Sequence, residues 1–168
     1  TPDPDGIALA AARAAGWARL AGTAPKDRRI ALILSDYPGA AGQDAHAVGL
    51  DAIESTVEVL RLLDAEGYRA GADLPDNRAV VAALCDAGPT PFLSLTDYKR
   101  QFAGLPEDTR TRIVEAWGDP SDDPAIVGTG DDRHLALRFA RFGNVIAAIQ
   151  PDRGNALDRK ESYHAPDL

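Results

Sequence analysis

The stretch that decides the fold is R-I-A-L-I-L-S, Arg29–Ser35. This nearly continuous apolar run follows basic residues and predicts a strand covered on both faces, which is typical of a parallel sheet. A polar loop containing glycines follows from Asp36 to Gly49. Asp51 is then expected to cap a helix from Ala52 to about Glu66, whose apolar residues recur at helical spacing. Strand, loop and helix in this order are typical of an α/β fold.

The segments on either side extend this unit into one expected domain, residues 1–168. We expect a leading helix (1–22) capped by Asp5, a βαβα unit (29–90), a helical insert (95–117), an acidic loop (118–133), and a hairpin with a closing segment (134–168). The second strand of the βαβα unit is expected at 68–70, and Asn77 is expected to cap the helix after it. The predicted fold is therefore α/β, with strand–loop–helix (Rossmann-like) layers, several short helices and a C-terminal β-hairpin turning at Phe142-Gly143-Asn144.

Composition excludes several classes of protein. The net charge of -8, the pI near 4.8 and the lack of a Lys/Arg block argue against a nucleic-acid binder, which needs a basic face. The single cysteine, Cys85, excludes an internal disulfide and fits a reducing cytosol, so we expect a cytoplasmic protein. No apolar run approaches the roughly 20 residues that span a bilayer. The chain contains no Met and begins T-P-D-P-D, which we interpret as a piece of a longer protein.

The loop after the first strand is one candidate ligand site. It contains Asp36 and His46 and leads to Asp51. Ligands in α/β folds bind outside the carboxyl ends of strands, and helix N-termini favour anionic groups. The loop matches neither G-x-G-x-x-G nor a Walker A motif, so it does not indicate a nucleotide. The alternative is a long connection in which Gly and Pro solve turn geometry and Asp51 is only a cap.

The end of the chain is a second candidate site. The apolar run Val145–Ile149 meets Gln150 and Arg153, and a further polar group contains Tyr163 and His164. The unperturbed pKa of a histidine is about 6.5, so His164 could move protons; the alternative is a loop histidine bonded to a backbone carbonyl. Arg153 could pair with a carboxylate. Gln150 could orient a ligand or satisfy backbone groups beside a proline.

The same closing segment resembles one family. Its order G-N-V-x-x-A-I-Q-P-x-R-G-x-x-x-D-x-x-x-S-Y-H-x-P-D-L is similar to the large subunit of cobaltochelatase (CobN-type), which is related to the magnesium chelatase H subunit. The triplet D-Y-P (36–38) and V-G-L-D (48–51) also match. The middle of that loop departs from the family, whose members often carry a basic, Asn-rich segment there. Such subunits exceed a thousand residues, so this chain would be a fragment of one.

The resemblance implies a function. It implies ATP-dependent insertion of cobalt(II), as substrate, into hydrogenobyrinic acid a,c-diamide during aerobic cobalamin synthesis. The partners would be an AAA+ ATPase subunit, which binds the ATP, and a second small subunit. The residues that would act are His164 as catalytic base and, for the tetrapyrrole substrate, Gln150, Arg153, Tyr163, Asp36, His46 and Asp51.

Two alternatives stay open. One is a segment of a magnesium-chelatase-type H subunit. The other is a non-catalytic α/β module that docks partner subunits. The residues do not identify the metal by themselves, because His46 and His134 have no second His or Cys at metal-site spacing and no ligand set is visible.

Overall fold

The computed structural model describes residues 3–35 and 49–151. The helical elements are α1 (Pro4–Gly22), η1 (Pro25–Asp27), α2 (Ala52–Ala65), α3 (Asn77–Val81), the π-helical η2 (Ala82–Asp86), α4 (Leu95–Phe102), α5 (Glu107–Trp117) and η3 (Pro120–Asp122). The strands are β1 (Ile30–Leu34), β2 (Thr90–Ser94), β3 (Ile126–Val127), β4 (His134–Leu137), β5 (Phe139–Phe142) and β6 (Val145–Ile149). This mixture of helices and strands confirms the α/β prediction.

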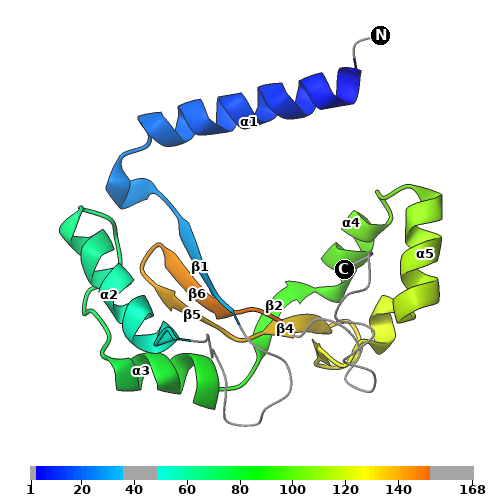
Figure 1. Ribbon diagram of the computed structural model, residues 1–168. Coiled ribbons are helices and arrows are strands. Elements are labelled where there is room, and N and C mark those ends of the chain that lie inside the picture. The colour runs from blue at the N-terminus through cyan, green and yellow to red at the C-terminus, as the bar shows by residue number, and fades with distance from the viewer. Residues whose placement is uncertain (1–2, 36–48, 152–168) are drawn as a thin grey trace.

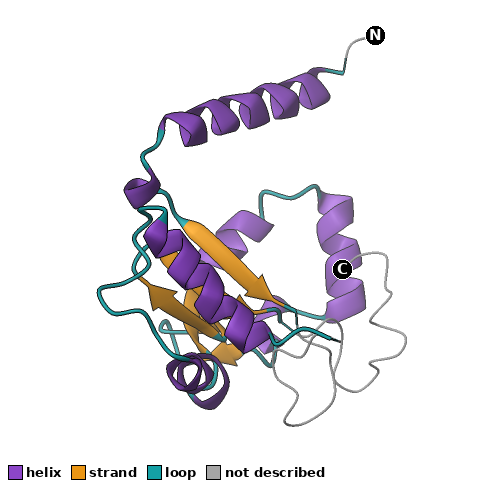
Figure 2. Cartoon of the chain, turned by 60° about the vertical axis from the view of Figure 1, so that its left-hand side comes forward, coloured by secondary structure: helices purple, strands orange, loops and turns teal. Residues whose placement is uncertain are grey.

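The first sheet has the strand order β1-β6-β5 and contains the predicted strand and hairpin. β1 runs parallel to β6, and β5 pairs with β6 in antiparallel fashion around Gly143. Helix α2 lies against this sheet, as Figure 2 shows. The core between the sheet and its helices contains Leu34, Val57 and Leu84, all nearly inaccessible to solvent. Burial of these side chains is the main stabilising term for the layer.

One prediction for β1 was wrong within the described residues. The strand is not covered on both faces: Leu34 is 7% exposed, but its neighbour Ile33 is 60% exposed. Successive side chains of a strand point to opposite faces, and the core helices pack on the Leu34 side only. β1 is also an outer strand of its sheet as described.

The second sheet, of order β2-β4-β3, was not predicted. Residues 134–149 form three strands rather than the expected two, because the chain leaves one sheet at Arg138 and enters the other. Strand β2 contains Pro91, where the sequence indicates only a break. A proline lacks the N–H that a central strand needs, but β2 is an edge strand of its sheet as described, and proline is tolerated in edge strands. Helices α4 and α5 confirm the helical segment expected at 95–117.

Other local predictions also needed correction. Asp3, not Asp5, caps α1 by accepting a hydrogen bond from the backbone N–H of Asp5 (3.1 Å), which places Pro4 at the first helical position. Asp76 rather than Asn77 caps α3. The expected strand at 68–70 is absent; the carbonyl of Arg69 in that segment instead accepts a hydrogen bond from the N–H of Asn144 (2.7 Å).

Helix α1 stands apart from the two sheets and their helices (Figure 1). None of its residues is buried. Among the helices described, α1 included, none combines the length and the apolar character that a membrane crossing requires.

Candidate functional site

The two candidate segments leave the first sheet at adjacent points. In the parallel pair, Leu34 at the end of β1 is in register with Ile149 at the end of β6. The N–H of Gln150 donates to the carbonyl of Leu34 (2.9 Å), so the pairing continues one residue beyond β6. The carboxyl ends of parallel strands are where α/β proteins bind ligands. The loop that follows β1 and the closing segment that follows β6 therefore start side by side.

Asp51 lies at the N-terminus of α2, after the first of these segments. Its carboxylate accepts a hydrogen bond from the N–H of Glu54 (2.9 Å), and its carbonyl accepts from the N–H of Ser55 (2.9 Å). These contacts make it an N-cap, as predicted. The Glu54 carboxylate also lies in the first turn and accepts a hydrogen bond from the Asn77 side chain. Two carboxylates thus already face the positive end of this helix dipole, which weakens its attraction for a third anion.

Most of the other predicted site residues lie outside the described residues. They are Asp36, His46, Arg153, Tyr163 and His164. Gln150 is described, is partly buried, and is tied to β1 through its backbone N–H. The structure therefore brings together the origins of the two segments, and the roles of these side chains remain predictions.

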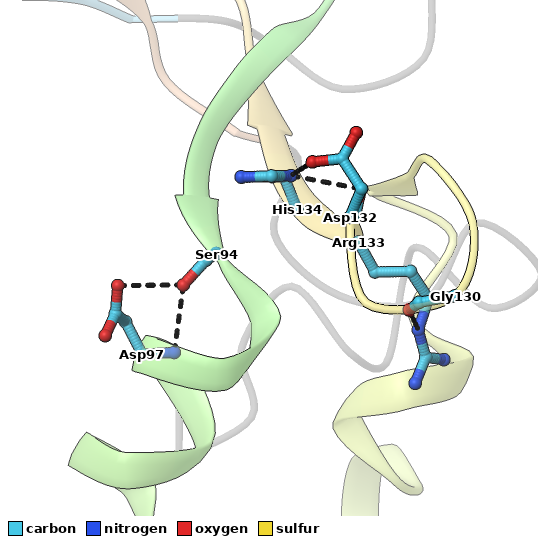
Figure 3. Close-up of polar contacts among 6 residues, drawn as sticks. All are labelled: Ser94, Asp97, Gly130, Asp132, Arg133 and His134. Carbon is cyan, nitrogen blue, oxygen red and sulfur yellow. Dashed lines mark hydrogen bonds and ion pairs between the residues drawn. The ribbon is translucent and has the colours of Figure 1, made fainter.

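The end of the second sheet carries a polar group that sequence reasoning missed (Figure 3). Ser94 caps α4: its hydroxyl accepts from the N–H of Asp97 (3.0 Å) and donates to the Asp97 carboxylate (2.8 Å). Arg100 also pairs with that carboxylate (2.7 Å). The Ser94 hydrogen bond, followed by the charge of Arg100, holds the pKa of Asp97 below its ordinary value. The pattern S-L-T-D at 94–97 is the sequence signal for this cap.

His134 lies opposite Ser94 in the β2–β4 register, but its own contact is with the preceding turn. Its Nδ1 lies 3.2 Å from the carbonyl oxygen of Asp132 and 3.7 Å from the Asp132 carboxylate. Arg133 donates to the carbonyl of Gly130 (3.3 Å) in the same turn. Within residues 3–35 and 49–151, no three His, Cys, Asp or Glu side chains gather closely enough to hold a metal ion. We interpret this group as a turn and a helix cap.

Comparison with known proteins assigns the whole length of the chain to one family. Residues 1–168 match the family model described as CobN/Magnesium Chelatase. The chain belongs to the CobN/magnesium chelatase family. Its relatives in this family include the aerobic cobaltochelatase subunit CobN of Sinorhizobium sp, which is 40% identical over 172 residues, covering 96% of this chain and 13% of the relative. The CobN subunit of Pseudomonas aeruginosa is 32% identical over 177 residues, covering 99% of this chain and 14% of the relative.

The family also includes a magnesium chelatase relative and a solved structure. The H subunit of magnesium chelatase from Chlorobaculum parvum is 29% identical over 147 residues, covering 82% of this chain and 11% of that protein. The catalytic subunit of cobaltochelatase from Mycobacterium tuberculosis has a TM-score of 0.79 and 34% identity, covering 100% of this chain and 14% of that one. The chain thus spans about one-seventh of the length of its CobN relatives, and the expected fragment of a larger subunit is confirmed.

Proposed function

We propose that this chain is part of the tetrapyrrole-binding large subunit of an ATP-dependent cobaltochelatase. The complete enzyme would insert cobalt(II) into hydrogenobyrinic acid a,c-diamide in aerobic cobalamin synthesis. The two cobaltochelatase relatives share 40% and 32% identity with the chain, against 29% for the H subunit of magnesium chelatase. The preference for cobalt rests on this difference and on the closing segment Q-P-x-R-G and Y-H-x-P-D-L.

The observation that carries the proposal is the adjacency of the ends of β1 and β6. Leu34 is in register with Ile149, and the N–H of Gln150 donates to the carbonyl of Leu34. Both candidate segments therefore begin at one edge of the sheet, the edge formed by the carboxyl ends of β1 and β6. A macrocycle held at that edge would meet residues from both segments. A corrin precursor carries carboxylates at its rim and pyrrolic N–H groups at its centre, so it requires both cationic and proton-accepting partners.

Each predicted residue has a role in this proposal. Arg153 pairs with a rim carboxylate, and Gln150 and Tyr163 orient polar groups of the ring. His164 accepts a pyrrolic proton as the metal ion enters, because neutral imidazole is a base near neutral pH. From the other segment, Asp36 and His46 contact the ring, while Asp51 positions α2. The ATP would be hydrolysed by a partner AAA+ subunit, acting with a second small subunit.

The test uses the full-length large subunit, assembled with its two partner subunits. His164→Ala is compared with His134→Ala, because His134 contacts the Asp132 turn and pairs with Ser94 in the second sheet, and so belongs to neither candidate segment. We expect His164→Ala to slow cobalt insertion at saturating substrate and His134→Ala to leave it unchanged. Equal rates for His164→Ala and the unsubstituted enzyme across the pH range would exclude the histidine as the base.

A second measurement addresses the metal and the ring. Substrate binding is followed by Trp fluorescence quenching with hydrogenobyrinic acid a,c-diamide and, separately, with a porphyrin. Tighter binding of the corrin precursor, with cobalt inserted in preference to magnesium, supports the proposal. Preference for the porphyrin and magnesium would instead assign the chain to the magnesium-chelatase type. Binding of neither ring would leave a docking module as the function.

A further inference from the structure

Helix α1 exposes a stripe of large apolar side chains. Leu9, Trp17 and Leu20 are 56%, 72% and 43% exposed, and they recur at spacings of eight and three residues, which places them on one face of the helix. A soluble protein rarely leaves a tryptophan and two leucines of one helix face uncovered together, and such surfaces mark contact sites.

Hydrogen bonds fix the C-terminal end of α1 to the first sheet layer, so the apolar stripe has a defined orientation. Arg28 donates from Nε to the carbonyl of Thr23 (2.9 Å), the residue that ends α1, and from its guanidinium to the hydroxyl of Tyr68 (2.8 Å). The Asn144 side chain donates to the carbonyl of Lys26 in the connecting turn (2.9 Å). Yet the 19 residues of the helix bury no side chain. Most helical stability in proteins comes from packing of an apolar face, which α1 lacks within the described residues.

Arg13 adds a charge requirement to the apolar stripe. It lies four residues from Leu9 and four from Trp17, so it projects from the same face. If the face is covered, the guanidinium leaves water, and a buried cation is stable only with an anionic, hydrogen-bonding partner. The surface that covers α1 therefore needs an apolar groove with a carboxylate opposite Arg13. Arg19, the other arginine of the helix, points away from this face.

The length of the relatives indicates where this surface comes from. The solved catalytic subunit matches 100% of this chain, so α1 is included, while 14% of that subunit is covered by the match and the rest lies outside it. We propose that the Leu9–Arg13–Trp17–Leu20 face of α1 packs inside its own large subunit, in an apolar groove of the polypeptide beyond residues 1–168 that carries a carboxylate opposite Arg13. This contact is independent of the metal, the ring and the base assigned under the proposed function.

The test is oxidative footprinting of the full-length large subunit, without its partner subunits. The oxidation rate of Trp17 is read by peptide mass spectrometry and compared with its rate in the denatured subunit. We expect a decrease of about tenfold or more, because a residue in a packed contact touches neighbours on every side. A tryptophan that stays 72% exposed would slow by less than about twofold, and that result would overturn the proposal.

If another polypeptide covers the apolar face of α1, the footprinting gives a different result. Protection that develops only after the partner subunits are added would assign the stripe to a different polypeptide. Protection that depends on the concentration of the large subunit would assign it to a second copy. Either outcome refutes packing within the subunit.

The carboxylate is tested by charge reversal. Arg13→Glu is expected to raise the oxidation rate of Trp17 several-fold in the full-length subunit, whereas Arg19→Glu, the matched change away from the stripe, leaves it unchanged. Equal effects of the two variants would refute the carboxylate opposite Arg13. Ala15→Asp, also away from the stripe, controls for loss of helix content.

Discussion

Gly143, in the hairpin between β5 and β6, is a position where an added methyl group should strongly destabilise the fold. Its φ is +59°, and a Cβ there would lie 2.7 Å from the backbone nitrogen of Gly71 and closer still to the carbonyl oxygen of Arg69. That same carbonyl accepts the 2.7 Å hydrogen bond from Asn144. Because the neighbouring atoms are backbone, they cannot rotate away as a side chain would. Gly143→Ala must therefore shift the hairpin away from residues 69–71.

The magnitude follows from three contributions. An alanine at positive φ costs about 1–2 kcal/mol. Overpacking against a rigid neighbour costs about 1–3 kcal/mol, and loss of the hydrogen bond from Asn144 about 0.5–1.5 kcal/mol. Gly130 provides the control, because its φ is +57° but a methyl group added to it would meet nothing within 4 Å. Gly130→Ala should therefore show the φ cost alone, and Gly143→Ala should exceed it by about 1.5–4.5 kcal/mol.

Urea unfolding followed by far-UV circular dichroism measures both variants against the unsubstituted chain. The expected result is a small decrease in the unfolding midpoint for Gly130→Ala and a much larger decrease, or failure to fold, for Gly143→Ala. Equal decreases would refute the reasoning, because they would show that the hairpin does not approach Arg69 and Gly71 as closely as the structure has it.

Three further predictions concern the core, a cap and a carboxylate. Leu84→Ala should lower the free energy of unfolding by about 2–5 kcal/mol, because Leu84 is fully buried, and Leu62→Ala, at a 57% exposed position, should cost far less; similar urea midpoints would contradict this. Asp51→Ala should cost about 1 kcal/mol through loss of the α2 cap, and Asp51→Ser should recover most of it in the same assay. Ser94→Ala removes the main cause of the lowered pKa of Asp97, so that pKa should rise when the carboxyl carbon is titrated by NMR. Because the folded pKa is lowered, ionised Asp97 favours folding above its unfolded pKa, and this contribution is lost as pH falls through the folded pKa.

Local signals predicted the first layer well. The apolar run of β1, the helical spacing of α2 with its cap at Asp51, and the Gly-containing hairpin turn each depend on residues close together in sequence. The cap at Ser94 was equally local, and the S-x-x-D pattern would have placed it. Asp3 and Asp5 are both suitable N-cap residues, so residue type alone does not decide between them. The position of Pro4 does, because proline is favoured at the first helical position, which makes Asp3 the cap.

The second sheet could not be predicted in this way. Its strands pair residues far apart in the sequence, such as Pro91 with Ala136, and the first of them contains a proline. The division of residues 134–149 at Arg138 depends on which sheet each half joins, not on the apolar pattern, which runs through both halves. For the same reason the sequence indicated the two candidate segments but did not show that they begin next to each other. The segments after Leu34 and Ile149 become neighbours only when β1 pairs with β6 in parallel.

The electrostatics at that edge constrain how an anionic ring could be held. The chain carries a net charge of -8, so it repels a substrate with several carboxylates at long range. The positive end of α2 is already faced by the carboxylates of Asp51 and Glu54, and the Glu54 group is engaged by Asn77. A helix dipole so compensated offers little to a further anion, because its effect falls off within one turn. Under the proposed function, recognition of the ring's carboxylates therefore falls to cationic side chains rather than to the backbone. In the closing segment this argument favours Arg153 over Asp51 as a substrate-binding residue.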